Sequence, residues 1–201
     1  MAGRNTLAEG PVNFIHIRPA KAVDAPGLAR VEVDAWRDTY PDVLPASYLT
    51  KTLEVPLCEA RWQRRIRRER AWPPLVALTG QSLSSMPQRI AAYATFGPTR
   101  LPNLPFAVEL FELYVHPEAQ GQGIGKRLCA AGAERVYRKG YDSICVEVLE
   151  QNANRFFYES LGAHLVARRE HPFAGKTLPA CIYGWTDIRT LARPRIRKPA
   201  A

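Results

Sequence analysis

Three glycines that follow a strand-like run and open an amphipathic segment constrain the fold of this chain more than any other feature. Residues 106–115 have the character of a strand, and Gly121, Gly123 and Gly125 come shortly after it. Backbone N–H groups at the start of a helix lack intrahelical partners, and the helix dipole adds positive potential there. Glycines leave room for a bulky anion to approach such donors. The segment therefore predicts a strand–loop–helix unit that binds a diphosphate through its main chain.

The segment after the glycines has the apolar spacing of a helix that packs on a sheet. We expect this helix to run from residue 123 to about residue 139, because apolar or small residues recur every four positions. These residues are Ile124, Leu128, Gly132 and Val136.

Two familiar phosphate-binding loops do not match this segment. A P-loop has four residues between its first glycine and a Gly-Lys pair that Ser or Thr follows, whereas three residues separate Gly121 from Gly125 and Arg127 follows Lys126. A dinucleotide-binding fingerprint needs a third glycine where Lys126 stands, and a place after the first strand of a βαβ unit. A glycine turn without a ligand is the remaining alternative, although such glycines cost stability unless a contact compensates.

The rest of the chain alternates between strand-like and helix-like patterns. Strands are expected at residues 14–18, 75–79, 89–96, 106–115, 143–149, 164–169 and 180–186, the second and third forming a hairpin. Helices are expected from an Asp24 cap to about residue 37, in two short pieces between residues 47 and 68 that Pro56 interrupts, and near residues 152–161. This order of elements predicts an α+β domain with a mixed sheet.

Length and composition indicate one soluble domain. The chain has 201 residues, of which 46% are hydrophobic and 23% charged, and a single domain usually spans about 100–200 residues. No apolar run approaches the ~18 residues that would span a bilayer, and the first residues lack the pattern of a secretory signal, so we expect a cytoplasmic protein. We place the domain at residues 13–188, between a flexible N-terminus of residues 1–12 and a flexible basic tail of residues 189–201.

The cysteines and histidines do not have the spacing of a metal site. Cys58, Cys129, Cys145 and Cys181 form no C-x-x-C pair, and the four histidines form no H-E-x-x-H motif. We therefore expect neither a bound metal nor a disulfide. Cys145 and Cys181 lie in strand-like runs, where a thiol usually packs as a small hydrophobic group.

The net charge of +9 would suit an anionic partner, but much of it is concentrated in two places, the segment 61–70 and the tail. On a helix, this segment would turn Leu57, Trp62 and Ile66 inward and most of its arginines to water. The pattern favours a solvated face over a nucleic-acid interface, and the basic surface can still attract an acidic substrate from a distance. The arginines are Arg61, Arg64, Arg65, Arg67, Arg68 and Arg70.

Two motifs resemble those of one enzyme superfamily. The segment 120–125, Q-G-Q-G-I-G, resembles the Q/R-x-x-G-x-G signature with which GNAT N-acetyltransferases hold the pyrophosphate of CoA. The segment 152–162, N-A-N-R-F-F-Y-E-S-L-G, resembles the family's N-x-x-R-x-F-Y-E-x-L-G segment on the helix after the fifth strand. The resemblance covers roughly residues 14–188, in the first sixty of them by pattern alone. It implies a GNAT-like, mostly antiparallel mixed sheet of about seven strands flanked by helices.

The resemblance also implies a reaction. A GNAT enzyme transfers an acetyl group from acetyl-CoA to a primary amine of a small molecule or protein, by direct attack in a ternary complex and without a metal. Trp36 and Tyr40 are implied in the wall of the amine pocket, with a role as aromatic anchors of the core as the alternative. Asn152 is implied to bond the pantetheine arm, and a helix cap is its alternative role. The residues implied to bind the cofactor are Leu113, Val115, Gln120, Gly121, Gln122, Gly123, Ile124, Gly125, Lys126 and Asn152.

Acetyl transfer to an amine needs a proton acceptor, since an alkylamine with a pKa of ~10.4 is almost fully protonated at pH 7. Alternation along residues 106–115 places Glu109 and Glu112 on opposite sides of the strand. Glu109 has the position of the family's glutamate base and is preferred over Glu112, with Glu147 as a weaker third candidate. A salt-bridged or solvent-facing glutamate is the alternative. Tyr158 matches the family's general acid for the departing CoA sulfur, with a packed core tyrosine as the alternative.

Two further functions stay open at this point. The chain could be a CoA-binding sensor or interaction module that has lost catalysis, or a nucleic-acid-binding module that uses its arginines. A homodimer is compatible with the resemblance, because paired domains are common in the superfamily. The sequence does not identify the acceptor amine.

Overall fold

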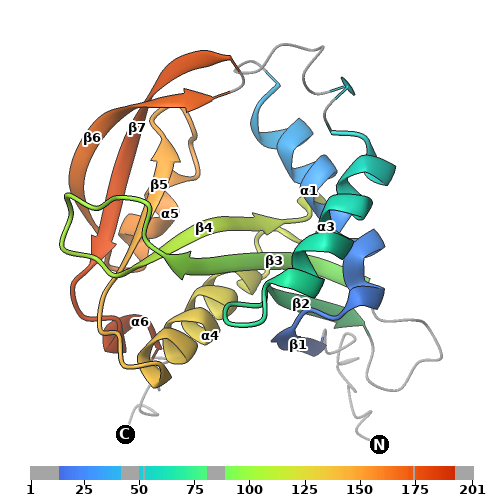
Figure 1. Cartoon of the computed structure of the whole chain (residues 1–201), viewed down its shortest axis with the longest axis horizontal. Helices are drawn as coiled ribbons and strands as arrows, with labels where there is room; N and C mark the ends of the chain where they lie inside the picture. The colour runs from blue at the N-terminus through green and yellow to red at the C-terminus, as the bar shows by residue number, and fades with distance from the viewer. Residues whose placement is uncertain (1–13, 42–49, 52, 81–88, 174, 193–201) are drawn as a thin grey trace, which may run out of the picture.

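The computed structural model describes residues 14–41, 50–51, 53–80, 89–173 and 175–192, in which a seven-stranded sheet is flanked by helices (Figure 1). The strands are β1 (Phe14–Pro19), β2 (Leu75–Gly80), β3 (Arg89–Pro98), β4 (Val108–Val115), β5 (Ile144–Leu149), β6 (His164–Phe173) and β7 (Lys176–Trp185). The helices are η1 (Ala22–Asp24), α1 (Ala25–Thr39), α3 (Val55–Arg68), η2 (Pro117–Ala119), α4 (Ile124–Arg138), α5 (Arg155–Ser160) and α6 (Arg189–Ala192). The predicted α+β architecture is confirmed.

The strands lie in the order β1-β2-β3-β4-β5-β7-β6, and every neighbouring pair except β4–β5 is antiparallel. β4 and β5 are parallel and pair through three residues each, the last pair being Leu110 with Val146. Beyond this pair the two strands diverge, so the sheet opens along their C-terminal halves. A parallel pair needs a long crossover, and α4 provides it.

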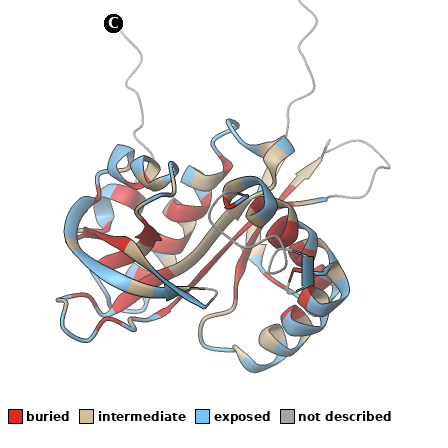
Figure 2. Ribbon diagram, turned by 90° about the horizontal axis from the view of Figure 1, so that it is seen from above, coloured by how far each residue is buried: buried red, intermediate tan, exposed pale blue. Residues whose placement is uncertain are grey.

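Helices cover both faces of the sheet, and the buried residues lie between the layers (Figure 2). On one face, Leu28 of α1 and Trp62 of α3 pack against Tyr93 of β3. On the other face, the predicted stripe of α4 is buried, and Leu128 packs with Leu110 of β4. The expected spacing of four residues on α4 is thereby confirmed.

The first two helices differ in detail from expectation. Asp24 is the N-cap residue of α1 but makes no side-chain cap bond to it. Its carboxylate instead accepts hydrogen bonds from Arg18 at 2.6 and 2.8 Å and from the backbone N–H of Lys21 at 2.7 Å. Pro56 does not interrupt a helix but lies in the first turn of α3, where its missing N–H costs nothing. Residues 47–49 and 52 of the predicted first helical piece lie outside the described residues.

The inner face of α3 was predicted correctly for Trp62 and wrongly for Leu57. Trp62 is buried, whereas Leu57 is 53% exposed and Cys58 takes the inward position. Two of the arginines are held by carboxylates of other elements: Arg61 donates to Glu32 at 2.7 Å, and Arg65 donates to a glutamate of β4 at 2.6 Å. The cluster is therefore only partly a solvated face.

The hairpin β6–β7 is longer than the sequence suggested. The predicted strands ended at residue 169 and began again at residue 180, whereas β6 runs to Phe173 and β7 begins at Lys176. Pro172 of β6 pairs with Thr177 of β7. β6 is an edge strand, and such a strand tolerates a residue without an N–H donor.

Ordered structure extends past the predicted domain end at residue 188. Ile188 and Leu191 are buried, and α6 packs against α4. Residues 1–13 and 193–201, which contain the predicted flexible N-terminus and most of the predicted tail, lie outside the described residues.

Candidate active site

The glycine-rich loop after β4 is shaped by two residues in the left-handed region. Gly121 has φ 72° and Gly123 has φ 73°, values that residues with a Cβ atom rarely adopt. Gly123 is also the N-cap residue of α4, and no side chain caps this helix end. The first N–H groups of α4 therefore have the arrangement that binds an anion at a helix N-terminus.

A cavity of about 460 Å³, here called the loop cavity, is bounded by this loop, the end of β4 and α5. Gln122 lies apart from it, and its Nε2 donates to the carbonyl oxygen of Glu118 at 3.3 Å. The other residues predicted to bind the cofactor all line this cavity, namely Leu113, Val115, Gln120, Gly121, Gly123, Ile124, Gly125, Lys126 and Asn152.

A second cavity of about 430 Å³, here called the strand cavity, lies where β4 and β5 diverge. Residues 111–114 of β4 and 146–149 of β5 line two of its sides. Trp36 and Tyr40 from α1, and His171 and Phe173 from β6, also line it. The structure thus brings Trp36 and Tyr40 into one cavity, and their place in an amine pocket stays a prediction.

The two cavities share a wall of four residues, Leu113, Tyr114, Asn152 and Tyr158. Asn152 Nδ2 donates to the Tyr40 hydroxyl at 3.1 Å, which links the segment after β5 to α1 across this wall. Burial, with smaller contributions from Cys129 and Tyr40, raises the pKa of Tyr158 well above its ordinary value. Tyr158 therefore stays a phenol, and so a proton donor, across the physiological pH range.

Aromatic rings form one side of the strand cavity. Trp36 stacks on Phe173 with ring centroids 5.5 Å apart, and Tyr40 lies 5.5 Å from Trp36 in an edge arrangement. Tyr114 completes the group, 6.0 Å from Trp36. A ligand in this cavity would therefore contact flat apolar surfaces on one side.

Glu109 is enclosed by one arginine. Its side chain is 1% exposed, and its carboxylate accepts hydrogen bonds from the Arg100 backbone N–H at 2.9 Å, Nε at 3.3 Å and Nη2 at 2.5 Å. It lines neither the loop cavity nor the strand cavity. The structure does not bring Glu109 together with the other predicted site residues, and its role as the base stays a prediction.

The expectation that Glu109 and Glu112 point to opposite sides of β4 is wrong. Thr95 of β3 pairs with Glu112 and Phe96 pairs with Leu110, so Phe111 is an extra residue in β4. Such a bulge reverses the alternation beyond it, which puts both carboxylates on the α1/α3 side. Glu112 lines the strand cavity, and its Oε2 accepts hydrogen bonds from Arg65 at 2.6 Å and Thr95 at 2.7 Å.

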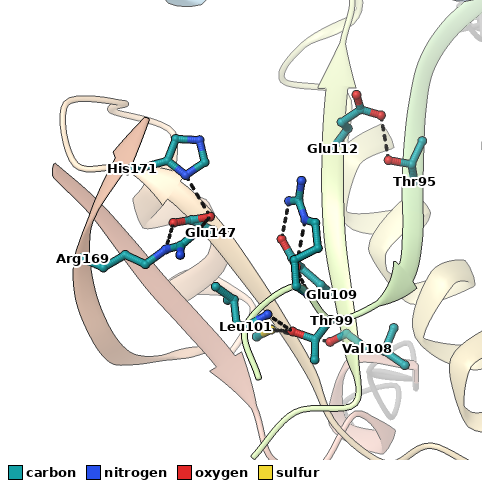
Figure 3. Close-up of polar contacts among 11 residues, drawn as sticks. Thr95, Thr99, Leu101, Val108, Glu109, Glu112, Glu147, Arg169 and His171 are labelled. Carbon is teal, nitrogen blue, oxygen red and sulfur yellow. Dashed lines mark hydrogen bonds and ion pairs between the residues drawn. The ribbon is translucent and has the colours of Figure 1, made fainter. Parts of the chain in front are cut away.

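Glu147 joins two side chains of β6 at the strand cavity (Figure 3). Its carboxylate accepts hydrogen bonds from Arg169 at 2.5 and 2.8 Å, and Nδ1 of His171 lies 3.1 Å from its Oε2. Burial alone would raise the pKa of Glu147, but the bonds from Arg169 and the contact with His171 outweigh it, and the pKa lies below its ordinary value. Glu147 is therefore a stable anion beneath the imidazole.

The sequence interpretation missed His171 and Phe173. The signal that could have found them is their alternation on one strand, two residues apart, which places both side chains on the same face. The predicted strand ended at residue 169, so neither residue was assigned to it.

Chemistry based on metal or thiol groups finds no support in the described residues. Among them, no group of three or more His, Cys, Asp or Glu side chains could hold a metal ion. All four cysteines are buried, and burial raises the pKa of Cys145 to about 11.

No helix of the described ranges is both long enough and apolar enough to cross a bilayer.

The chain is similar to known acetyltransferases. A family model described as "Acetyltransferase (GNAT) domain" matches residues 76–162. YuaI of Bacillus subtilis (strain 168), an uncharacterized N-acetyltransferase, is 32% identical over 179 residues, which are 89% of this chain and 96% of YuaI.

Solved structures agree in fold. An N-acetyltransferase from Staphylococcus aureus Mu50 superposes with a TM-score of 0.62 and 20% identity over 87% of this chain and 99% of that chain. The yncA protein of Salmonella typhimurium, solved with its cofactor acetyl-CoA, has a TM-score of 0.59 and 22% identity over 93% of this chain and 98% of that chain. The match to YuaI along nearly its whole length carries the assignment of the family: the chain belongs to the GNAT superfamily of N-acetyltransferases.

Proposed function

We propose that the chain transfers the acetyl group of acetyl-CoA to a primary amine held in the strand cavity, by direct attack in a ternary complex. The observation that carries the proposal is the shared wall of the two cavities. One cavity has the loop that suits a diphosphate, the other has room for a small acceptor, and both reach Tyr158. A donor in the loop cavity and an acceptor in the strand cavity could therefore come into contact at the shared wall.

The loop cavity would hold the donor. Main-chain N–H groups from Gly121 to Lys126 would bind the diphosphate, and Lys126 adds a positive charge. Leu113 and Val115 would offer backbone groups to the pantetheine arm, and Asn152 would orient it. Two proteins of similar fold support this assignment, since yncA was solved with acetyl-CoA and PaiA from Thermoplasma acidophilum was solved in complex with coenzyme A.

Tyr158 would protonate the CoA sulfur as the thiolate leaves. The raised pKa keeps the proton on this hydroxyl before the reaction, and it also makes the phenol a weaker acid than the thiol, whose ordinary pKa is ~8.5. Glu109 is the candidate base from the sequence. Arg100 encloses its carboxylate, so this role would require the pair to open or a water to mediate.

The acceptor would be a compact amine. A cavity of about 430 Å³ is in the range of small-molecule sites, which are about 300–1,000 Å³. An amine with an apolar or aromatic group would fit against Trp36 and Phe173. A protein amine presented on an exposed chain is the other acceptor class that this proposal includes.

The test is a thiol-release assay with acetyl-CoA and a panel of polyamines, aminoglycosides, amino acids and peptides. We expect turnover with at least one amine, and intersecting double-reciprocal plots when both substrates are varied. Parallel plots would contradict direct attack in a ternary complex. Acetyl-CoA binding by calorimetry together with no turnover on any amine would favour the sensor function instead.

A further inference from the structure

We infer that His171, oriented by Glu147, takes the proton from the acceptor amine. The inference rests on the proposed function and names a residue of this chain that would carry its proton transfer. It assigns Glu147 a positioning role, and it gives the long β6–β7 hairpin a part in the chemistry.

The geometry defines a dyad. Nδ1 of His171 is buried and lies 3.1 Å from Glu147 Oε2, within ion-pair distance but without the angles of a hydrogen bond, and Nε2, on the far side of the ring, points away from the carboxylate (Figure 3). The ring is 26% exposed and lines the strand cavity. The ring of Phe173 lies beside the imidazole, with its centroid 6.0 Å away. A carboxylate at Nδ1 favours the tautomer that leaves Nε2 unprotonated and able to accept a proton.

The chemistry favours an imidazole over the three carboxylates. A general base works best when it titrates near the working pH, which an imidazole does and a carboxylate does not. Each carboxylate is also bonded to a guanidinium group, Glu109 by Arg100, Glu112 by Arg65 and Glu147 by Arg169. Of the described residues that line the strand cavity, His171 is the one imidazole.

Atoms and protons balance across the transfer. The amine nitrogen forms a bond to the acetyl carbonyl carbon, and its proton passes to Nε2 of His171. The carbon–sulfur bond breaks, and the sulfur takes the proton of the Tyr158 hydroxyl. His171 then releases its proton to solvent, and Tyr158 takes a proton from solvent. The products are therefore the amide and the free thiol.

Several charges act on His171 from the elements around it. Glu147 on β5 is in contact with it, and its own strand contributes Arg169. The other charged groups that line the strand cavity are Arg65 of α3, Arg100 of the loop after β3 and Glu112 of β4, and Glu109 is bonded to Arg100 outside the cavity lining. Removing the Glu147 charge should therefore weaken the imidazolium form, since this carboxylate lies 3.1 Å from Nδ1.

The test compares three variants with the wild type over pH, using acetyl-CoA and the amine of the panel with the highest kcat/KM. His171→Gln should lower kcat roughly 100-fold at pH 7, with the affinity for acetyl-CoA unchanged in calorimetry. Its remaining rate should follow only the ionisation of the amine itself. Glu147→Gln should move the acid limb of the kcat profile to lower pH. His164→Gln, on the same strand but outside both cavities, is the matched control and should behave as the wild type.

Imidazole NMR of the full chain gives a readout that does not depend on turnover. We expect neutral His171 as the Nδ1–H tautomer in the wild type, and loss of this preference in Glu147→Gln. If the folded His171→Gln variant retains the kcat of the wild type and the acid limb of its pH profile, the inference is overturned. If the Glu109→Gln variant loses this acid limb, Glu109 is identified as the base. A wild type that binds acetyl-CoA but acetylates no amine would instead refute the proposed function.

Discussion

Gly123 has two roles, since it adopts a left-handed backbone conformation and leaves the N-terminal end of α4 open. No atom lies within 4 Å of a Cβ built on it, so a substitution there would strain the backbone without a clash. Gly123→Ala should lower the free energy of unfolding by about 1–2 kcal/mol, measured in urea, and should weaken acetyl-CoA binding. Gly140→Ala is the matched control, because Gly140 has φ 88° and lies at the other end of α4. It should lose similar stability and keep its affinity for acetyl-CoA. Equal binding by both variants would contradict the role of the loop.

Tyr158 offers a second test, which concerns a single hydroxyl group. Tyr158→Phe removes the hydroxyl and keeps the ring that packs in the core. We expect kcat to fall roughly 100-fold while the affinity for acetyl-CoA stays within a few-fold, since the hydroxyl would act on the leaving thiolate. Tyr137→Phe, at an exposed tyrosine of α4, serves as the control. A Tyr158→Phe enzyme of normal kcat would assign this residue to packing alone.

Single residues were predictable where a motif or a conformation fixed them. The left-handed glycines and the positions of Tyr158 and Asn152 beside the loop cavity follow from short segments, because left-handed glycines and a helix after a strand are local features. His171 was not predictable in this way. Its partner Glu147 lies on a strand separated from β6 by β7, and only the folded sheet brings the two together.

Among the helices and strands, α4 and β3 are in unusually close contact. A Cβ added to Gly132 would lie 2.0 Å from Cζ of Phe96, so the ring occupies the space above the glycine. Gly132→Ala should destabilise the protein by about 1–3 kcal/mol through overpacking. Adding Phe96→Leu should recover part of this loss, which a double-mutant cycle of thermal or urea unfolding would measure. Strictly additive effects of the two substitutions would show that they do not share this space.

The elements themselves were largely predictable, but their irregularities were not. Apolar periodicity located every strand, because half-buried strands and helices leave distinct patterns in the sequence. The bulge at Phe111 left no such mark, and it changed which side of β4 Glu112 faces. The ends of β6 and β7 that meet in the hairpin were missed. Pro172 lies on the edge strand β6, and Pro179 lies on β7 just beyond its last pair with β5.

For the protein as a unit, the pH dependence of stability depends on a few partly buried carboxylates. Burial opposes the ionisation of Asp24, but the bonds from Arg18 and from the N–H of Lys21 outweigh it and lower its pKa. A carboxylate with a lowered folded-state pKa stabilises the protein above its unfolded pKa, and this contribution is lost as the pH falls below about 4. Asp24→Asn should cost about 1.5–3 kcal/mol at pH 7 in urea unfolding. The free energy of unfolding of this variant should also fall less than that of the wild type as the pH is lowered. An equal fall in the two proteins would show that Asp24 is not the source of the pH dependence.

The hydrogen bond between Asn152 and Tyr40 has a consequence for the energetics of the complete enzyme. Any free energy that CoA adds to amine binding must equal what the amine adds to CoA binding, and such couplings typically change affinity about 5- to 150-fold. Titrating CoA with and without the amine should reveal this mutual enhancement. Tyr40→Phe, which keeps the ring and cuts the bond, should reduce it toward none. Cooperation between the two ligands would then be a property of one hydroxyl group that joins the two halves of the sheet.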